Sequence, residues 1–311
     1  MKKYWTGVVL ALAAAVCWGI MSPIAKIVSA AGVSLMTAMV YRGFFVAATV
    51  GPLLYVTKGA SIFRQSPRFL KFYMLSGFLT VVASGGGFLM SLEYLTVAEA
   101  LIVHYMFPLV TLAGSCFITH EKPTRLQVLA GFMIVLGVYV GMVSGEKSFA
   151  GLSVPGMMWG IFAVIGISGQ SLVVRRVARE VEIDQIVLLF YGHLFGAIML
   201  LVGKTFFMGW SDLANITPQV FMLMNVQSLA GSLFAFGCFY TALKYIPAAT
   251  VSLLCTLEIV TAVALTALLL SIIPTAREVF GCAVIMLAVV FATVKPKEYR
   301  ENSTPGQALQ E

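Results

Sequence analysis

The sequence predicts an all-α integral membrane protein with ten transmembrane helices, arranged as two inverted five-helix repeats with both termini in the cytoplasm. Three observations support this prediction: the composition, the distribution of basic residues and an internal repeat. Of the 311 residues, 60% are hydrophobic and 11% are charged, whereas soluble domains carry about 25% charged residues. Ten spans of about 20 residues would use about 200 residues. The remainder is too short for loops, tails and a soluble catalytic domain.

Apolar runs of about 20 residues define the ten expected spans. They cover 7–28, 34–56, 70–92, 96–117, 125–144, 153–173, 184–203, 219–242, 247–270 and 277–294. The first run follows two lysines and resembles a signal peptide, but it is longer than the apolar region of such a peptide. We therefore expect it to be retained as the first span.

The basic residues test this topology independently, because loops retained in the cytoplasm are enriched in Lys and Arg. With the N-terminus inside, fifteen of the 20 basic residues lie in cytoplasmic segments, including the connection that holds Arg175, Arg176 and Arg179. Arg42 falls within a span. The four outer ones are Lys26, Lys147, Lys204 and Arg277. The net charge of +7 therefore reflects cytoplasmic loops, and we expect no nucleic-acid partner.

The two halves of the chain align without a gap, residues 86–123 against 237–274, at an offset of 151 residues. Matching positions include Tyr94 with Tyr245 and Pro123-Thr124 with Pro274-Thr275. Because five is an odd number, the second repeat enters the membrane from the opposite side. Such inverted repeats place a substrate site near the membrane midplane, between the two copies. The expected units are a first repeat at 7–144, a second repeat at 151–294 and a cytoplasmic tail at 295–311.

Ionisable side chains inside a span cost about 2.5 to 3.5 kcal/mol each at the helix centre and usually face the bundle interior or a water-filled cavity. Glu258 lies in the middle of the ninth span. It could be a counter-charge for a cationic substrate group, a proton carrier or a buried structural partner of Arg42. Arg42 in turn could bind a carboxylate through two hydrogen bonds or clamp two helices together.

Other polar groups within the spans are further candidates. His104 and His193 either form hydrogen bonds between helices or take part in substrate or proton binding, since histidine titrates in the physiological range. Gln170 carries an amide that needs partners in a medium without water, and Trp18 is a candidate for lining the same cavity. Glu99 lies near the outer end of its span, so we expect it at the solvated interface.

The sequence contains few signs of other chemistries. Its five cysteines all lie in apolar runs without a C-x-x-C pair, so we expect packing residues and no disulfide framework or metal site. Hydrolase, zinc-enzyme and ATP-binding motifs are missing, so we expect no cofactor and no catalytic residue. An integral membrane enzyme that uses His104 or His193 as a base is the alternative from another class. It would require an acidic residue that orients the histidine.

A series of short motifs follows the predicted spans in order. They are Trp18-Gly19, Ser22, Lys26, Arg42, Tyr94, Ala98, Pro108, Glu121, Gly131, Gly137, Arg175-Arg176, Tyr245, Pro247-Ala248 and Leu257-Glu258. In order and repeat spacing, this series resembles the drug/metabolite transporter superfamily, of the EamA type with two five-helix repeats, over roughly 7–294. The family often has Leu-Glu-Pro where this chain has Leu257-Glu258-Ile259, so the resemblance does not extend to a proline kink there. Ile272 and Ile273 stand where the family has an acidic residue.

The resemblance implies a central cavity, alternating access and, often, export of amino acids or related metabolites. We expect a multi-pass secondary transporter of the cytoplasmic membrane that moves a small polar metabolite such as an amino acid. An exporter of cationic drugs or amines is the alternative, because Glu258 is the deepest charge. The expected partners are the small-molecule substrate, membrane lipid and a coupled proton. The expected substrate-binding residues are Trp18, Arg42, His104, Gln170, His193 and Glu258.

Overall fold

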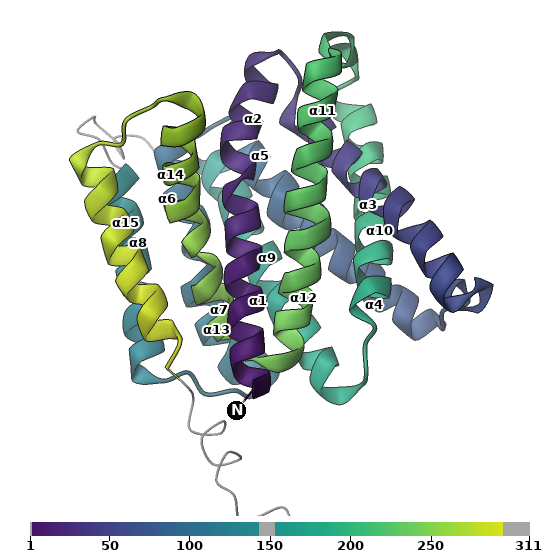
Figure 1. The fold of residues 1–311 in the computed structure, drawn as a ribbon, viewed down its shortest axis with the longest axis horizontal. Coiled ribbons are helices and arrows are strands. Elements are labelled where there is room, and N and C mark those ends of the chain that lie inside the picture. The colour runs from purple at the N-terminus through teal and green to yellow at the C-terminus, as the bar shows by residue number, and fades with distance from the viewer. Residues whose placement is uncertain (1, 143–152, 295–311) are drawn as a thin grey trace, which may run out of the picture.

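The computed structural model describes residues 2–142 and 153–294, and every regular element in these ranges is helical (Figure 1). Within them, nine helical rods are long and apolar enough to cross a membrane. A further apolar helix, α15 (Ala276–Ala292), has 17 residues. The chain is therefore an all-α integral membrane protein. The expected tail at 295–311 and Lys147 lie outside the described residues.

The first half of the chain forms five rods, three of which are interrupted. Its elements are α1 (Lys2–Gly19), α2 (Met21–Ala30), α3 (Leu35–Lys58), η1 (Ala60–Phe63), α4 (Pro67–Gly77), η2 (Phe78–Gly86), α5 (Gly87–Ser91), α6 (Val97–His104), α7 (Phe107–Gly114), η3 (Ser115–Thr119) and α8 (Arg125–Met142). Here η2 and η3 are π-helical turns and η1 is a short 3₁₀ helix.

The second half also forms five spans, but its first span is one unbroken helix and its fourth span has no π-helical turn. Its elements are α9 (Val154–Glu180), α10 (Gln185–Phe207), η4 (Ser211–Asn215), α11 (Pro218–Gln227), η5 (Ser228–Phe234), α12 (Ala235–Tyr245), α13 (Ala248–Cys255), α14 (Leu257–Leu270) and α15. The sixth span ends seven residues later than the sequence predicts, so Arg175, Arg176 and Arg179 lie on α9 rather than in a connection. Lys204, expected in an outer loop, lies in the last turn of α10 and is buried.

Two irregularities occur at matching positions in the two halves. The π-helical turns η2 and η5 interrupt the third span of each half, and the fourth span of each half breaks at Tyr105 and at Thr256, 151 residues apart. In the first half, Pro108 explains the break, because it has no N–H for the carbonyl of His104. In the second half there is no proline. The Thr256 hydroxyl instead donates to the carbonyl of Leu253 at 2.7 Å, a contact that bends helices.

The last span of each half starts with the same cap. Thr124 and Gln127 exchange side-chain and backbone hydrogen bonds at the start of α8, and Thr275 and Glu278 do so at the start of α15. These capping boxes satisfy backbone N–H groups that the helix leaves unpaired. They explain why Pro123-Thr124 matches Pro274-Thr275.

α8 and α15 pack against each other at one side of the bundle, away from its centre (Figure 1). Gly137 and Gly281 allow the close approach, because a Cβ on Gly281 would lie 2.5 Å from the Gly137 carbonyl oxygen. Small residues in contact are typical of helix pairs in membranes, where backbones approach closely.

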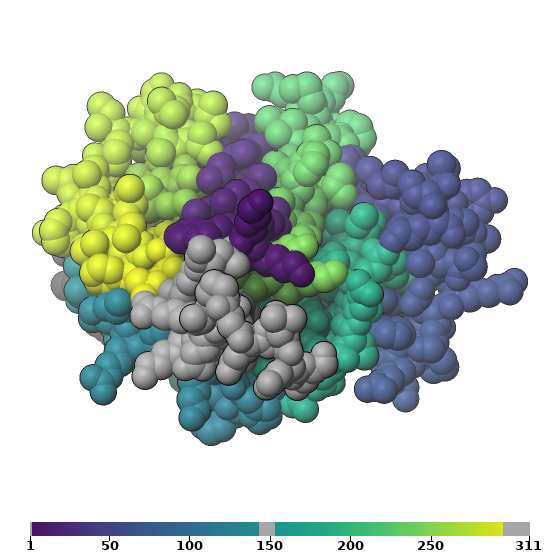
Figure 2. All heavy atoms as spheres, turned by 60° about the horizontal axis from the view of Figure 1, so that its bottom comes forward, coloured from purple at the N-terminus to yellow at the C-terminus, as the bar shows by residue number. Residues whose placement is uncertain are grey.

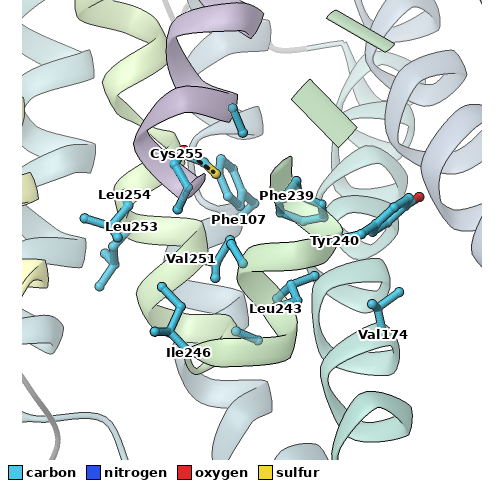
Figure 3. Close-up of a cluster of buried hydrophobic side chains, with 14 of the residues drawn as sticks. Phe107, Val174, Phe239, Tyr240, Leu243, Ile246, Val251, Leu253, Leu254 and Cys255 are labelled. Carbon is cyan, nitrogen blue, oxygen red and sulfur yellow. Dashed lines mark hydrogen bonds between the residues drawn. The ribbon is translucent and has the colours of Figure 1, made fainter. Parts of the chain in front are cut away.

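The bundle is closed at the end that holds the N-terminus, called the lower end here. All eight residues of α13, in the lower half of the ninth span, are buried, whereas only Ile259 is buried among the 14 residues of α14. Figure 3 shows Leu243, Val251 and Leu254 below Cys255, within one cluster of buried hydrophobic side chains. Figure 2, with the lower end turned forward, shows the start of α1 inserted between α15 and the green segments of the second half. The described residues therefore pack closely together at this end.

Candidate functional site

A cavity of about 270 Å³ lies in the middle of the bundle and is lined by eight of the ten spans, all except α8 and α15. The size is near the lower limit of ligand pockets, about 300 to 1,000 Å³, and suits a small metabolite. All six residues proposed from the sequence line this cavity: Trp18, Arg42, His104, Gln170, His193 and Glu258. The structure thus brings them together, and their role in substrate binding stays a prediction.

Arg42 carries a charge for which the described part of the chain provides no acidic partner. Its Nη1 contacts the sulfur of Met21 at 3.6 Å, and its Nε is buried without a hydrogen-bond acceptor. Glu258, the structural partner considered above, forms no ion pair with it in the described residues. A guanidinium held away from water without a partner is costly, and a negative group in the cavity would lower that cost.

Glu258 lies in the first turn of α14, directly after the break in the ninth span. The hydroxyl of Tyr105, at the matching break in the fourth span, donates to Glu258 Oε1 at 2.6 Å. Such a bond to an ionised oxygen is short and strong. The N-terminus of α14 adds a favourable field for negative charge, so both broken helices act on one carboxylate.

The two charges belong to different sides of the cavity. Arg42 comes from α3 and Glu258 from α14, and Figure 1 shows α1 and α2 between these two helices. The site therefore offers a hydrogen-bond donor with positive charge on one wall and a carboxylate on another. A molecule with both a negative and a positive group complements this arrangement.

The two histidines differ in their surroundings. His193 is buried, and its Nδ1 lies 3.0 Å from the carbonyl oxygen of Leu189 on the same helix, which requires a proton on Nδ1. His104 Nδ1 is buried without a hydrogen-bond partner, and its ring packs on Phe88 with centroids 4.7 Å apart. Within the described residues neither histidine contacts a carboxylate. The orienting acid that a base of a membrane enzyme requires is thus missing there.

Trp18 presents its ring rather than its N–H to the cavity. Its Nε1 donates to the carbonyl of Gly231 in the π-helical turn η5 at 2.9 Å, and the ring packs on Phe236 and Phe239 with centroids 5.2 and 5.3 Å away. This anchors the upper part of α1 to the eighth span and makes one wall of the cavity aromatic.

Gln170 forms part of the floor of the cavity. Its Nε2 donates to the hydroxyl of Tyr240 at 2.8 Å, and that hydroxyl lies 3.4 Å from Thr80 Oγ1. The three side chains come from α9, α12 and η2, so a hydrogen-bonded group links three spans just above the closed lower half.

Comparison with known proteins identifies the family. The model of the EamA-like transporter family matches residues 5–143 and again residues 154–294. The chain belongs to this family.

Relatives of the EamA-like chain agree with this assignment. It is 27% identical over 201 residues to a protein called "Uncharacterized inner membrane transporter YhbE" in Escherichia coli K12, a match that covers 60% of this chain and 59% of the relative. The same protein of Shigella flexneri matches equally. A solved crystal structure, described only as that of a protein, superposes with a TM-score of 0.78 at 19% identity over 96% of this chain and 99% of the other. The EamA-like chain is thus a multi-pass protein of the cytoplasmic membrane, and it belongs to a family of transporters.

Sequence reasoning missed two residues of this EamA-like site, Tyr105 and Tyr240. Both phenols are buried and bond to polar groups of the cavity. A tyrosine in a span counts as apolar in a hydropathy pattern, and the search for functional groups covered charged residues, histidines and amides. The signal that could have found Tyr105 is its place beside His104 and three residues before Pro108.

Glu99 belongs to a helix cap and not to the cavity. Its carboxylate accepts from the backbone N–H and hydroxyl of Thr96 at 2.9 Å each, which completes a capping box at the start of α6. In the described part of the chain, no group of three or more His, Cys, Asp or Glu side chains could hold a metal ion.

Proposed function

We propose that this transporter exports small zwitterionic metabolites, amino acids in the first place, across the cytoplasmic membrane by alternating access. The observation that carries the proposal is the guanidinium of Arg42, which lines the central cavity without an acidic partner in the described residues while Glu258 lines the same cavity from another helix. A guanidinium binds a carboxylate through two parallel hydrogen bonds. The ammonium group of the same substrate would then face Glu258.

The arrangement of the two halves supports alternating access. Repeats at 7–144 and 151–294 would move against each other around a central site, as in other transporters with inverted repeats. With the N-terminus in the cytoplasm, as the basic residues predict, the closed lower end faces the cytoplasm. The structure then corresponds to an outward-facing state, the state from which an exporter releases its substrate. Export also follows from the family resemblance, and Glu258 is the group that would exchange a coupled proton.

A flux experiment tests the substrate class. The purified protein in proteoliposomes should exchange at least one of the 20 common L-amino acids in a counterflow assay. Arg42→Ala should weaken its binding about tenfold or more, since a hydrogen bond to a charged group contributes about 1.5 to 3 kcal/mol. Arg176→Ala is the matched control, because the Arg176 side chain is 52% exposed and pairs with Glu180 outside the cavity. No flux of any amino acid, amine or organic anion would contradict the proposal.

The second candidate is export of cationic drugs or amines. The geometry of Glu258 favours it, because the carboxylate lies in the cavity and is fixed by Tyr105. A thermal-shift screen with amino acids, amines and nucleotide sugars, repeated on Arg42→Ala and Glu258→Gln, separates the two. An amino acid should lose its stabilising effect in both variants, whereas a simple amine should lose it only in Glu258→Gln.

A further inference from the structure

The floor of the cavity contains a hydrogen-bonded chain with a fixed direction. It runs from Gln170 through Tyr240 and Thr80 to the carbonyl oxygen of Ser76, with distances of 2.8, 3.4 and 2.7 Å. All three side chains are buried. Gln170 and Thr80 line the cavity, so the chain connects the cavity to the backbone of the third span.

The direction follows from the last link. Thr80 Oγ1 lies 2.7 Å from the carbonyl oxygen of Ser76, and a carbonyl can only accept, so the Thr80 proton lies between these two oxygens. Thr80 Oγ1 can then only accept from Tyr240. The phenol proton points to Thr80 or to the neighbouring hydroxyl of Ser76, and in either case the Tyr240 oxygen accepts from the amide of Gln170.

The orientation of the Gln170 amide is fixed as a result. Its NH₂ group faces Tyr240, and its carbonyl oxygen is the polar atom left for the cavity. Within the described residues this oxygen has no hydrogen-bond partner. Amide orientations are often ambiguous, and here the hydrogen-bond network decides between the two.

We propose that Thr80 and Tyr240 determine substrate specificity by holding the Gln170 carbonyl oxygen toward the cavity, where it accepts a hydrogen bond from an N–H of the substrate. This inference rests on the proposed function in that it assigns the N–H to the ammonium group of an amino acid. The cavity then has hydrogen-bond acceptors on two helices, Gln170 on α9 and Glu258 on α14. Its donor, Arg42, lies on α3. A substrate whose nitrogen carries no hydrogen is disfavoured although its charge is the same.

The test compares N–H donors with methylated analogues. Binding to the detergent-purified full chain is measured by thermal shift and by competition for the 20 common L-amino acids. The amino acid that binds best is compared with its N,N,N-trimethyl derivative. Wild type should prefer the N–H form by about tenfold or more, the effect of a hydrogen bond to a charged group.

The variants test the chain itself. Thr80→Val keeps the shape of the side chain but removes the acceptor of Tyr240 that lines the cavity, so the amide can turn. The preference should then fall to within about threefold, where tenfold corresponds to about 1.4 kcal/mol. Tyr240→Phe should have the same effect. Thr80→Ser keeps the hydroxyl and should retain the preference. Melting temperatures without ligand show whether each variant is folded, and the preference is a ratio measured on the folded protein.

The outcomes separate this inference from the proposed function. If amino acids bind but the preference is equal in wild type and Thr80→Val, the inference is wrong and the proposed function stands. A second outcome is that only amines bind, and that wild type but not Thr80→Val binds primary amines more tightly than their quaternary analogues. In that case the inference stands and the proposed amino-acid substrate is wrong. Binding of neither class would overturn both.

Discussion

Tyr105 is the residue that fixes the carboxylate of the cavity. It lies where the fourth span breaks, and its hydroxyl reaches across to the broken ninth span to donate to Glu258. A phenol can reach this position because the helix ends one residue earlier, at His104. One hydrogen bond therefore connects the two repeats at the level of the proposed substrate.

Replacing Tyr105 with Phe should weaken amino-acid binding about tenfold, because Glu258 loses a hydrogen bond to its charged form, which contributes about 1.5 to 3 kcal/mol. The measurement is the dissociation constant in detergent, together with counterflow in proteoliposomes. Tyr94→Phe is the matched control, since Tyr94 is 49% exposed and outside the cavity. Equal affinities in both variants would show that Tyr105 does not position Glu258.

Asp212 ties together the upper ends of the second and seventh spans. It accepts hydrogen bonds from the Ser34 backbone at 2.9 Å, from the Thr37 hydroxyl and from Lys204 Nζ at 3.2 Å. Burial raises the pKa of Asp212, but these hydrogen bonds and the Lys204 charge outweigh burial and hold the pKa below the ordinary value of 3.8. The ionised form is therefore stabilised by the fold.

This predicts a pH-dependent contribution to stability. A carboxyl group whose pKa is lower in the folded state stabilises the fold above its ordinary pKa, and that contribution is lost as the pH falls through the folded value. Asp212→Asn should lower the melting temperature at pH 7, and its difference from wild type should narrow below about pH 4. Glu182→Gln, with an 89% exposed side chain, should have little effect at either pH. A difference that is constant with pH would contradict the prediction.

At the scale of elements, the lower ends of three spans are held by one buried ion pair. Arg175 on α9 donates to Glu121 Oε1 at 2.6 and 2.9 Å, and also to the carbonyls of Leu243 and Lys244 at the end of α12. Glu121 follows η3, so the fourth, sixth and eighth spans meet here. Both charged side chains are 5% exposed.

Removal of one partner should be strongly destabilising. Glu121→Gln removes the buried carboxylate that pairs with Arg175 and lies 3.7 Å from Arg179 Nη1, and loss of one partner costs about 3 to 5 kcal/mol in comparable buried pairs. The matched control is Glu180→Gln in the pair Arg176–Glu180, where both side chains are 52% exposed and such pairs contribute about 0 to 1 kcal/mol. Unfolding in mixed micelles measures both. Equal losses would mean that burial does not distinguish the two pairs.

Elements also show where sequence reasoning reaches its limit. Hydropathy located the spans to within a few residues but missed the end of α9. A charged residue such as Arg175 is assigned to a loop by its hydropathy, although its side chain is buried. The break at Thr256 depends on a hydroxyl that donates to a carbonyl of its own helix. The sequence has no proline there from which the break could be predicted. Five of the six cavity residues could be found because ionisable and amide groups avoid lipid, and Trp18 belongs to the motif series of the family resemblance. The sequence could not show whether Arg42 and Glu258 pair, since pairing depends on packing between distant helices.

At the scale of the whole molecule, the lower half is closed by packing and the cavity lies above it. Alternating access requires that this lower half open during each cycle. Cys255 reports on such an opening, because its side chain lies in the closed region at 3% exposure with its sulfur 3.9 Å from the Ala11 carbonyl.

In a variant with Cys17, Cys116, Cys238 and Cys282 replaced by serine or alanine, a small thiol reagent should label Cys255 slowly. Labelling should accelerate when the transported amino acid is added, and again when the Glu121–Arg175 pair is broken, because both favour opening of the lower half. The rate is followed by mass spectrometry of the intact protein. Cys255→Ala in the same background sets the level of labelling without this thiol. A rate that does not depend on substrate would contradict alternating access through the lower half.

The matching breaks of the fourth and ninth spans carry different chemistry. The position that corresponds to Glu258 in the first half, 151 residues earlier, is Phe107, and Arg42 corresponds to Gly192, at the offset of 150 residues that aligns Tyr41 with Tyr191. The backbone is therefore nearly symmetric while each charge occurs once. A substrate that enters from the cytoplasm therefore meets these charges in a different arrangement from one that enters from outside. No rotation of the protein exchanges the two arrangements. We therefore expect the two faces to differ in affinity and in maximal rate, which transport assays with substrate on one side at a time would measure.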